Sequence, residues 1–231
     1  VRRHQPEAIV LFSSTNKVYG SMDSVVIEEN KSRYFAPDFP SGFDESLPLS
    51  FESPYGCSKG AIDQYMLDYH RIFGIRTVVF RHSSIYGTRQ FSTFDQGWIG
   101  WFVQNALSQA LKGAPAFTIS GNGKQVRDLL CAPDLVSCYF CAVKNIDLAA
   151  GHAFNIGGGI ENSFSLLELI GFLEEELKCS LAYDQLPARQ SDQKVFVADT
   201  TKAARLLNWS PQISREVGVR GMIDWVKTLL V

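Results

Sequence analysis

The chain has 231 residues, 45% of them hydrophobic and 20% charged, a composition typical of one large globular domain or a domain and a half. Its 22 basic residues against 24 acidic residues give a formal net charge of -2, which supplies no field for binding nucleic acid or an acidic membrane. No apolar run approaches the roughly 20 residues of a membrane span, and residues 1–6 lack the apolar core of a secretory signal. We therefore expect a cytoplasmic protein with neither a nucleic-acid nor a membrane partner.

The five cysteines are an odd and scattered set, which argues against a disulfide framework in a chain of this size. Cys138 and Cys141 form a CxxC, but they lie within a helical pattern and no second Cys/His pair follows them. The four histidines also lack the spacing of metal ligands. The sequence therefore predicts reduced thiols and no metal site.

Residues 8–12 form a short, continuous apolar run, the pattern of a parallel strand buried on both faces. A helical pattern with one apolar stripe follows over residues 54–73 and ends at Gly74, a typical C-cap residue. Residues 75–80 then read as a second strand. This order predicts a βαβ unit, with two parallel neighbouring strands joined by a right-handed crossover.

The segment between the first strand and the helix, residues 21–53, is long and rich in Ser, Pro and acidic residues, so we expect it to be functional or disordered. Further along the chain, the patterns predict a helix at 98–111, a strand at 116–120 and a turn at 121–123. A helix is expected near Asp134, with that residue as its N-cap, followed by a strand end and loop at 155–159. Two more helices are expected, one capped by Ser165 and running to Leu177, and one beginning at Thr200. A boundary between two lobes is expected near Gly87.

Three polar positions converge in the predicted sheet. Thr15 follows the first strand, Tyr55 opens the helix, and Ser83 follows the second strand, so all three belong at the carboxyl edge where open parallel sheets bind ligands. Lys59 lies one helical turn after Tyr55, and an ammonium at that distance stabilises a phenolate. A Tyr-x-x-x-Lys pair is common by chance on helices, but at this edge it predicts acid/base chemistry, with the threonine hydroxyl holding a substrate oxygen.

Six blocks carry a resemblance that runs from about residue 8 to residue 225: FSSTNKVYG, PYGCSK, FRHSSIYGTRQ, ISGNGKQVRDLLCAPDLV, FNIGGG and ADTTKAARLLNWSP. In this order and spacing they resemble the extended short-chain dehydrogenase/reductase family, the nucleotide-sugar epimerases and dehydratases. The resemblance implies an α/β fold: the C-terminal part of a Rossmann-like, doubly wound parallel sheet plus a smaller α/β substrate-binding lobe. Residues 1–87 would be the remaining part of the NAD-binding domain, and residues 88–231 mainly the nucleotide-sugar lobe, with some segments returning to the first.

The resemblance also implies roles for individual residues. Tyr55 would be the acid/base at the sugar hydroxyl, Thr15 would orient that hydroxyl, and Lys59 would tune the tyrosine and hold the nicotinamide ribose of NAD. Ser14 and Ser83 would contact the cofactor together with Tyr55 and Lys59. The implied substrate contacts are Thr15, Ser84, Gln90, Arg127 and Arg189, the two arginines holding the diphosphate. For either arginine alone, a solvated surface position is the commoner explanation.

Dehydratases of the family carry an acidic pair directly after the catalytic threonine, whereas this chain has Asn16 and Lys17. Dehydration and decarboxylation are therefore disfavoured, which leaves reversible hydride transfer, that is, epimerisation or reduction. Residues 89–102 are similar to the subgroup that epimerises CDP-sugars at C2, with CDP-paratose as substrate, in the synthesis of O-antigen sugars. Trp98 and Trp101 in this stretch would equally fit one face of a helix buried in the core.

Two other functions stay open: a 4-epimerase or reductase of UDP- or dTDP-sugars, and a non-catalytic nucleotide-sugar binding remnant. Family members begin with a strand and a glycine-rich turn that receives the cofactor pyrophosphate. The dense glycines of this chain, at 157–159, come late and read as a turn. We therefore expect the chain to start within the cofactor domain and, alone, to bind NAD weakly and be inactive. The resemblance also implies a homo-oligomer.

Overall fold

The βαβ unit expected near the start of the chain is present in the computed structural model, which describes residues 1–94, 96–189 and 192–230. Strands β1 (Val10–Thr15) and β4 (Thr77–His82) are parallel neighbours. Helix α1 (Ser53–Phe73) connects them, and β8 (His152–Ile156) adds a third parallel strand on the other side of β4. The predicted strands are confirmed, with boundaries displaced by about two residues towards the C-terminus.

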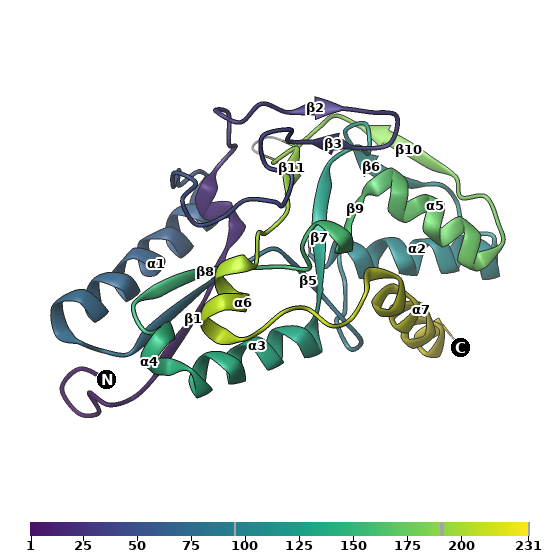
Figure 1. Cartoon of the computed structure of the whole chain (residues 1–231). Coiled ribbons are helices and arrows are strands. Elements are labelled where there is room, and N and C mark those ends of the chain that lie inside the picture. The colour runs from purple at the N-terminus through teal and green to yellow at the C-terminus, as the bar shows by residue number, and fades with distance from the viewer. Residues whose placement is uncertain (95, 190–191, 231) are drawn as a thin grey trace.

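The local sequence explains where α1 begins and ends. Pro54 stands in its first turn, where the missing N–H costs nothing because that donor has no partner within the helix. Gly74 ends the helix in the left-handed conformation, with φ of 65°, and donates its N–H to the carbonyl of His70. In Figure 1, α1 lies on one side of the three-stranded sheet, while α3 (Ala132–Lys144) and α6 (Thr201–Leu207) lie on the other.

The rest of the chain forms smaller sheets and surrounding helices. The remaining strands are β2 (Glu28–Glu29), β3 (Tyr34–Phe35), β5 (Ser84–Tyr86), β6 (Phe117–Ser120), β7 (Val126–Cys131), β9 (Ser163–Ser165), β10 (Tyr183–Leu186) and β11 (Val195–Phe196). The remaining helices are α2 (Trp98–Lys112), α4 (Ile146–Ala149), α5 (Leu166–Leu177) and α7 (Arg215–Leu230), with 3-10 turns η1 (Asn16–Tyr19) and η2 (Ile160–Asn162). Strand β7 is central here, since it pairs in parallel with β5 and β11 and antiparallel with β9.

Most of the elements expected after Gly87 are confirmed, including α2, β6 and α5. Ser165 caps α5 as predicted: its hydroxyl accepts the N–H of Glu168 at 3.0 Å, and the Glu168 carboxylate accepts the N–H of Ser165 at 2.9 Å. The predicted N-cap role of Asp134 is wrong. Helix α3 begins two residues earlier because Pro133 suits its first turn, and the Asp134 carboxylate instead accepts two backbone N–H groups that precede α7.

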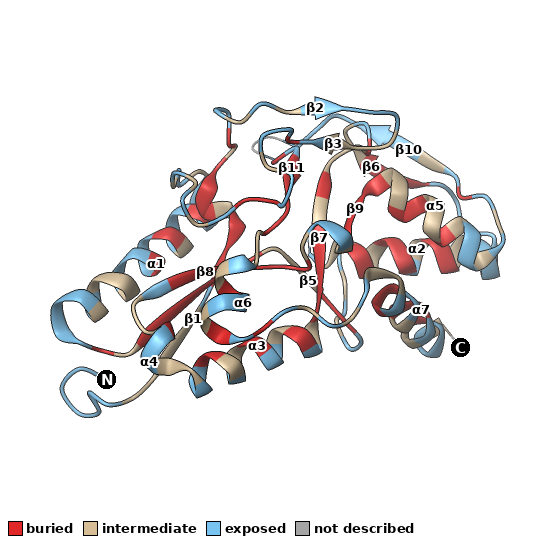
Figure 2. Ribbon diagram, in the orientation of Figure 1, coloured by how far each residue is buried: buried red, intermediate tan, exposed pale blue. Residues whose placement is uncertain are grey.

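Buried side chains gather in three clusters, shown in red in Figure 2. The first lies between α2, α5, α7 and the strands β6 and β7, and the second between the three-stranded sheet and α3 and α6. The third is built by the long connection of residues 21–53, whose Phe43 is 1% exposed and packs on Phe196 of β11. That connection is therefore packed rather than disordered. The division into lobes at Gly87 stays a prediction.

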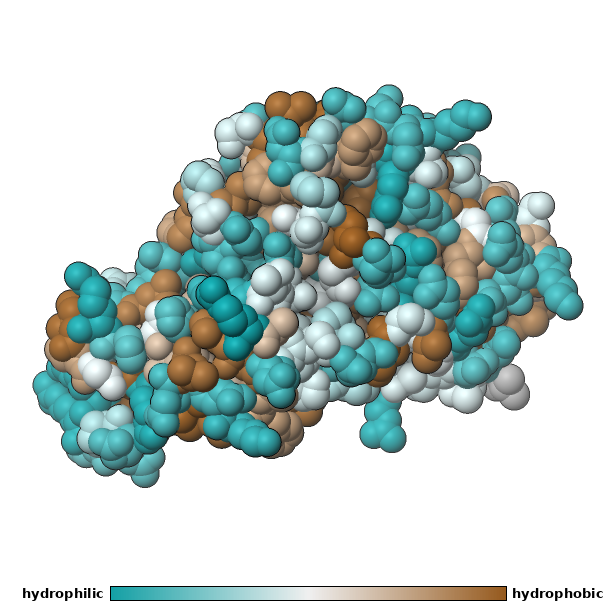
Figure 3. Space-filling model, viewed as in Figure 1, coloured by the Kyte–Doolittle hydropathy of each residue, from teal (hydrophilic) through white to brown (hydrophobic). Residues whose placement is uncertain are grey.

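The surface in Figure 3 mixes hydrophilic and hydrophobic residues, with small groups of brown atoms at the top, in the middle and at the left-hand end of the view. Exposed apolar side chains of α1 include Ile62, Tyr65 and Ile72. Within the described part of the chain, no helix is both long and apolar enough to cross a membrane. The mixed α/β architecture with parallel, Rossmann-like strands confirms the predicted fold class.

Candidate active site

The carboxyl end of β1 carries the first predicted catalytic residue. Thr15 is 6% exposed, and its hydroxyl accepts the N–H of Lys17 at 3.2 Å, which caps the short turn η1. This cap helps to start the turn, since Thr15 keeps an extended backbone while the residues after it form the 3-10 turn η1. The threonine hydroxyl is thus fixed at the edge of the sheet.

The first turn of α1 packs directly against η1. A Cβ atom added to Gly56 would lie 3.1 Å from the carbonyl oxygen of Lys17, so glycine allows the helix to approach this closely. The Ser53 hydroxyl accepts the N–H of Gly56 at 3.1 Å and thereby helps to start the helix. Tyr55, in the same turn, is 53% exposed, so its phenol is accessible beside the edge of the sheet.

Lys59 lies one turn after Tyr55 and is tied to β1. Its ammonium donates to the backbone carbonyl of Ser13 at 2.8 Å and lies 5.3 Å from the centre of the Phe12 ring. This contact fixes a positive charge between the helix and the strand. The structure therefore places the three predicted catalytic residues on adjoining elements: Thr15 at the end of β1, and Tyr55 and Lys59 at the head of α1.

A buried polar network lies behind this edge. Arg81 of β4 donates to both carboxylate oxygens of Asp63 on α1, each at 2.9 Å, and to the hydroxyl of Tyr19 at 3.0 Å. The Ser14 hydroxyl donates to the same carboxylate at 2.8 Å. Burial alone would lower the pKa of Arg81, but its hydrogen bonds to Asp63 hold that pKa above its ordinary value. Since the Ser14 hydroxyl is turned into this network, its role at the cofactor stays a prediction.

His82, at the end of β4, is 4% exposed and bonded at both ring nitrogens. Nδ1 lies 3.2 Å from the Ser13 hydroxyl and from the Ser14 carbonyl, and Nε2 lies 3.0 Å from the Tyr139 hydroxyl. Burial lowers its pKa to about 4. The imidazole is therefore neutral near pH 7, and its contacts with Ser13 and Ser14 stabilise the end of β1.

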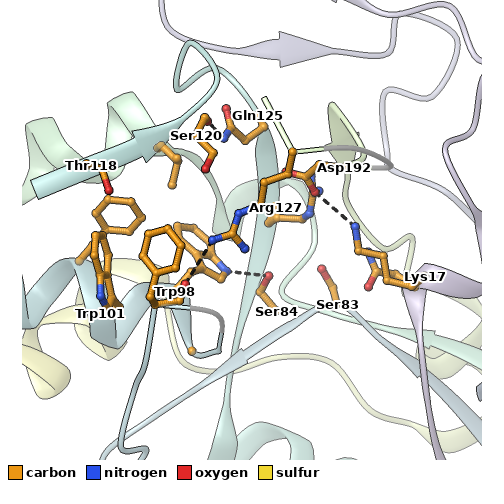
Figure 4. A pocket seen from close by; sticks show the side chains of 16 residues that line it. Lys17, Ser83, Ser84, Trp98, Trp101, Thr118, Ser120, Gln125, Arg127 and Asp192 are labelled. Carbon is orange, nitrogen blue, oxygen red and sulfur yellow. Dashed lines mark hydrogen bonds and ion pairs between the residues drawn. The ribbon is translucent and has the colours of Figure 1, made fainter. Parts of the chain in front are cut away.

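A cavity of about 390 Å³ opens beside η1 (Figure 4). Its charged lining residues are Lys17, Arg127, Arg189 and Asp192. Its uncharged polar lining residues are Asn16, Ser83, Ser84, Thr118, Ser120 and Gln125. Polar groups concentrated in a partly enclosed cavity at the carboxyl ends of strands are typical of a ligand site in an open α/β sheet.

Two of the charged groups, Lys17 and Arg127, pair with the carboxylate of Asp192. Asp192 Oδ1 accepts a hydrogen bond from Arg127 at 2.7 Å and from the ammonium of Lys17 at 3.3 Å (Figure 4). Burial, and then the positive charge of Arg127, lower the pKa of Lys17, while Asp192 opposes this shift. Burial also lowers the pKa of Arg127. Arg189 borders the same cavity, with its guanidinium 4.9 Å from the centre of the Phe94 ring and a bond to the Phe94 carbonyl at 3.3 Å.

Aromatic rings line the cavity away from Lys17. They are Phe94, Trp98, Trp101 and Phe102. The indole N–H of Trp98 donates to the Ser84 hydroxyl at 3.1 Å, and Trp101 lies near Thr118, at the end of the view opposite Lys17 (Figure 4). Both tryptophans also pack against the first core cluster. They therefore belong in part to the core face of α2, as one interpretation of the sequence expected, and in part to the cavity lining. Neighbouring rings meet edge to face, at interplanar angles of 75° to 87°, and together they form the apolar part of the cavity lining.

A pair of amides joins the cavity to the turn η1. Asn16 of η1 donates to the side-chain oxygen of Gln193 at 2.8 Å, and Gln193 donates to the Gly20 carbonyl at 2.8 Å. Gln193 is fully buried, and its neighbour Asp192 bonds Lys17. The segment that carries Asp192 is therefore fastened to η1 at two adjacent positions.

Four predicted site residues come together in the cavity: Ser83, Ser84, Arg127 and Arg189. Gln90 is not among the described residues that line it, and its amide donates to the Ile85 carbonyl at 3.3 Å, so its role as a substrate contact stays a prediction.

Sequence reasoning missed Asp192 and treated Lys17 only as the absence of an acid. The two lie 175 positions apart, so no local sequence pattern links them. Among the residues that the structure describes, no group of three or more His, Cys, Asp or Glu could hold a metal ion.

Comparison with known proteins shows the family of the chain. A family model described as GDP-mannose 4,6 dehydratase matches residues 1–222. The CDP-paratose 2-epimerase of Salmonella typhi is 53% identical over 229 residues, which cover 99% of this chain and 68% of that protein.

Two solved structures share the fold. The UDP-glucuronic acid 4-epimerase of Bacillus cereus, in complex with UDP-glucuronic acid and NAD, is 27% identical with a TM-score of 0.76, over 96% of this chain and 62% of that one. The UDP-glucose 4-epimerase of Thermotoga maritima, solved with UDP-glucose, is 25% identical with a TM-score of 0.77, over 96% of this chain and 64% of that one. The chain thus spans about two thirds of the length of these relatives.

Proposed function

Because the chain belongs to the extended short-chain dehydrogenase/reductase family, we propose that it carries the catalytic and substrate-binding residues of an NAD-dependent nucleotide-sugar epimerase. The substrate that we propose is CDP-paratose, inverted at C2 to CDP-tyvelose for surface polysaccharide synthesis. The observation that carries this proposal is that Thr15 stands directly before Asn16 and Lys17, which line a cavity together with Arg127 and Arg189. Tyr55 and Lys59 do not line this cavity, but they lie at the head of α1, which packs against β1 and η1. The identity of 53% to a CDP-paratose 2-epimerase supports the choice of sugar.

The residues at the edge of the sheet fit NAD. The Lys59 ammonium is fixed against β1 and can hold the nicotinamide ribose hydroxyls, while the exposed Tyr55 phenol lies one turn before it. Ser83 lines the cavity at the end of β4, where the nicotinamide would meet the sugar. Bound NAD would supply the hydride acceptor for oxidation of the sugar carbon and, once reduced, the hydride donor for its reduction from the opposite face.

Tyr55 and Thr15 handle the proton. Tyr55 removes the proton from the C2 hydroxyl as that carbon is oxidised and returns it when the carbonyl is reduced. The Thr15 hydroxyl, fixed by its bond to the N–H of Lys17, orients the same oxygen. The ammonium of Lys59 stabilises the phenolate while Tyr55 is deprotonated.

The side chains after Thr15 favour epimerisation over dehydration. Loss of water needs a further acid and base at the sugar, whereas Asn16 is an amide bonded to Gln193 and Lys17 is an ammonium paired with Asp192. Neither group is a carboxylic acid that can protonate a departing hydroxyl. A 4-epimerase of UDP- or dTDP-sugars is the alternative that keeps the same catalytic residues.

The test is to incubate the protein made from its full reading frame with CDP-paratose in D2O and to analyse the product by NMR. We expect inversion at C2 with no deuterium at that carbon, because the hydride returns from the cofactor rather than from solvent. Deuterium at C2 would refute hydride return, and inversion at C4 of UDP- or dTDP-glucose without reaction of CDP-paratose would favour the alternative. As a control for the loss of a lysine outside the site, Lys227→Met alters an exposed lysine of α7 and should leave the reaction unchanged.

We also propose a homo-oligomer in the cytoplasm. The exposed apolar residues of α1, including Ile62, Tyr65 and Ile72, support an interface on that helix. The five free cysteines support a reducing compartment. Light scattering of the protein made from its full reading frame tests the first point: a monomer at micromolar concentration would refute it.

A further inference from the structure

Lys17 brings a positive charge into the cavity at the end nearest to the catalytic threonine. Its backbone N–H is bonded to the Thr15 hydroxyl at 3.2 Å, so its position is tied to that of the reacting group. Its side chain is 32% exposed and lines the cavity, where Figure 4 shows it pointing towards Asp192. The cavity therefore has a cation within two residues of the hydroxyl that orients the sugar.

Two cations of the cavity lining share one carboxylate. Asp192 Oδ1 is the acceptor of both Lys17 and Arg127, so the three groups together carry a net positive charge, which suits the negative diphosphate of a nucleotide sugar. Burial and the nearby Arg127 lower the pKa of Lys17 and so disfavour its charged form, which an anion bound beside it would stabilise.

The position of Lys17 matters because of where the sugar carries its diphosphate. The diphosphate is attached at C1, and C2 is bonded directly to C1, whereas C4 lies across the pyranose ring. An enzyme that presents C2 to Thr15 and Tyr55 must hold the sugar-side phosphate close to those residues. An enzyme that presents C4 keeps the same phosphate a ring's width away. A cation anchored beside Thr15 is therefore suited to a reaction at C2.

We propose that Lys17 is a specificity-determining residue that binds the sugar-side phosphate of the diphosphate and so presents C2, rather than C4, to Tyr55. Asp192 holds the Lys17 and Arg127 side chains in place for the two phosphates. This inference rests on the proposed function, which supplies C2 as the reacting carbon. A purely structural role fits less well, since an ion pair that is partly open to solvent, as Lys17–Asp192 is with side chains 32% and 33% exposed, contributes little to folding.

The experiment compares two nucleotides that differ only in the second phosphate. CDP contains the phosphate that Lys17 would bind and CMP lacks it. Binding of each is measured by calorimetry to the protein made from its full reading frame, in the wild-type and Lys17→Met forms. We expect Lys17→Met to weaken CDP binding by roughly 10- to 100-fold, the effect of losing a charge-assisted phosphate bond, and to change CMP binding by less than about twofold.

Two further variants sharpen the result. Lys17→Arg keeps the charge and should retain most of the preference for CDP, and Lys227→Met, whose ion pair lies outside the cavity, should change neither affinity. Retained CMP binding shows that the Lys17→Met cavity is folded. An unchanged ratio of CDP to CMP affinity in Lys17→Met, or an equal loss for both nucleotides, would overturn the inference.

This outcome is independent of the test of the proposed function. The nucleotide affinities are measured without turnover, whereas the carbon that is inverted is read from the wild-type product alone. Where C2 inversion is observed, kcat/KM of Lys17→Met for CDP-paratose should fall by the same factor as CDP affinity. A variant that loses CDP affinity but keeps full kcat/KM would overturn the claim that this phosphate contact presents C2.

Discussion

Asp63→Ala should destabilise the protein strongly because it leaves a buried guanidinium without its partner. The side chain of Arg81 is 5% exposed and that of Asp63 is fully buried, and the two are joined by a pair of hydrogen bonds of 2.9 Å. With the carboxylate gone, Arg81 keeps its bond to the Tyr19 hydroxyl, and Ser14 loses its acceptor. The substitution thus removes four hydrogen bonds from one buried position: two from Arg81, one from Ser14 and one from the Gln64 amide.

The expected cost is about 3 to 5 kcal/mol in the free energy of unfolding, the usual range for removing one partner of a buried ion pair. Most of it comes from the uncompensated charge of Arg81. The double variant Asp63→Leu, Arg81→Met should therefore lose less than the sum of the two single variants, since it leaves no buried charge behind.

Urea unfolding followed by circular dichroism measures these differences. Asp68→Ala, on the same helix, is the matched control, because Asp68 pairs with Arg71 at the surface and should cost less than about 0.5 kcal/mol. A loss below about 1 kcal/mol for Asp63→Ala, with the urea dependence unchanged, would show that the Arg81 charge is not buried as the structure has it.

Three further predictions concern the site and its pH dependence. Tyr55→Phe should keep nucleotide-sugar affinity and lower turnover by roughly 10² to 10⁴, as expected for loss of a general acid/base, and unchanged turnover would remove Tyr55 from the mechanism. Arg189→Ala should weaken CDP-sugar binding by about 1.5 to 3 kcal/mol in calorimetry, and equal affinity would contradict its role at the diphosphate. Burial lowers the pKa of His82 to about 4, whereas an unfolded histidine titrates near about 6.5, so the unfolded chain gains the proton first. Stability should fall by about 3 kcal/mol as the pH drops from about 6.5 to 4, and a His82→Gln variant with the same pH dependence would contradict this assignment.

The elements that the sequence predicted share a local cause. The signals for α1 are the apolar stripe of residues 54–73, Pro54 at its start and Gly74 at its end, and all of them lie within or next to the helix itself. The strands of the βαβ unit were equally visible as short apolar runs. Asp134 was misplaced because an acidic residue before an apolar run looks like an N-cap, while its partners, two N–H groups nearly 80 positions away, leave no local signal.

The candidate site also contains some residues that the sequence could indicate and others that it could not. Thr15, Tyr55 and Lys59 were expected near one edge of the sheet because the ends of successive parallel strands converge there. The structure has them on adjoining elements, and their catalytic roles stay predictions. Asp63 and Asp192 were not singled out, since an aspartate on a helix or in a loop has the same local pattern whether it is solvated or paired. Their partners, Arg81 and Lys17, lie 18 and 175 positions away, and distant charge pairs are set by the tertiary fold alone.

Two separate polar systems support the site, and they meet at η1. The buried Asp63 and Arg81 pair fixes β4 to α1 and, through Ser14, the end of β1, whereas Asp192 gathers the cations that face the cavity. Gln193 joins them by bonding Asn16, the residue after Thr15. A change in the first system should therefore lower stability and turnover together, because it moves the strand end that holds the Thr15 hydroxyl, which we propose orients the substrate. A change in the second should lower affinity first, because the frame stays in place while the diphosphate loses a partner.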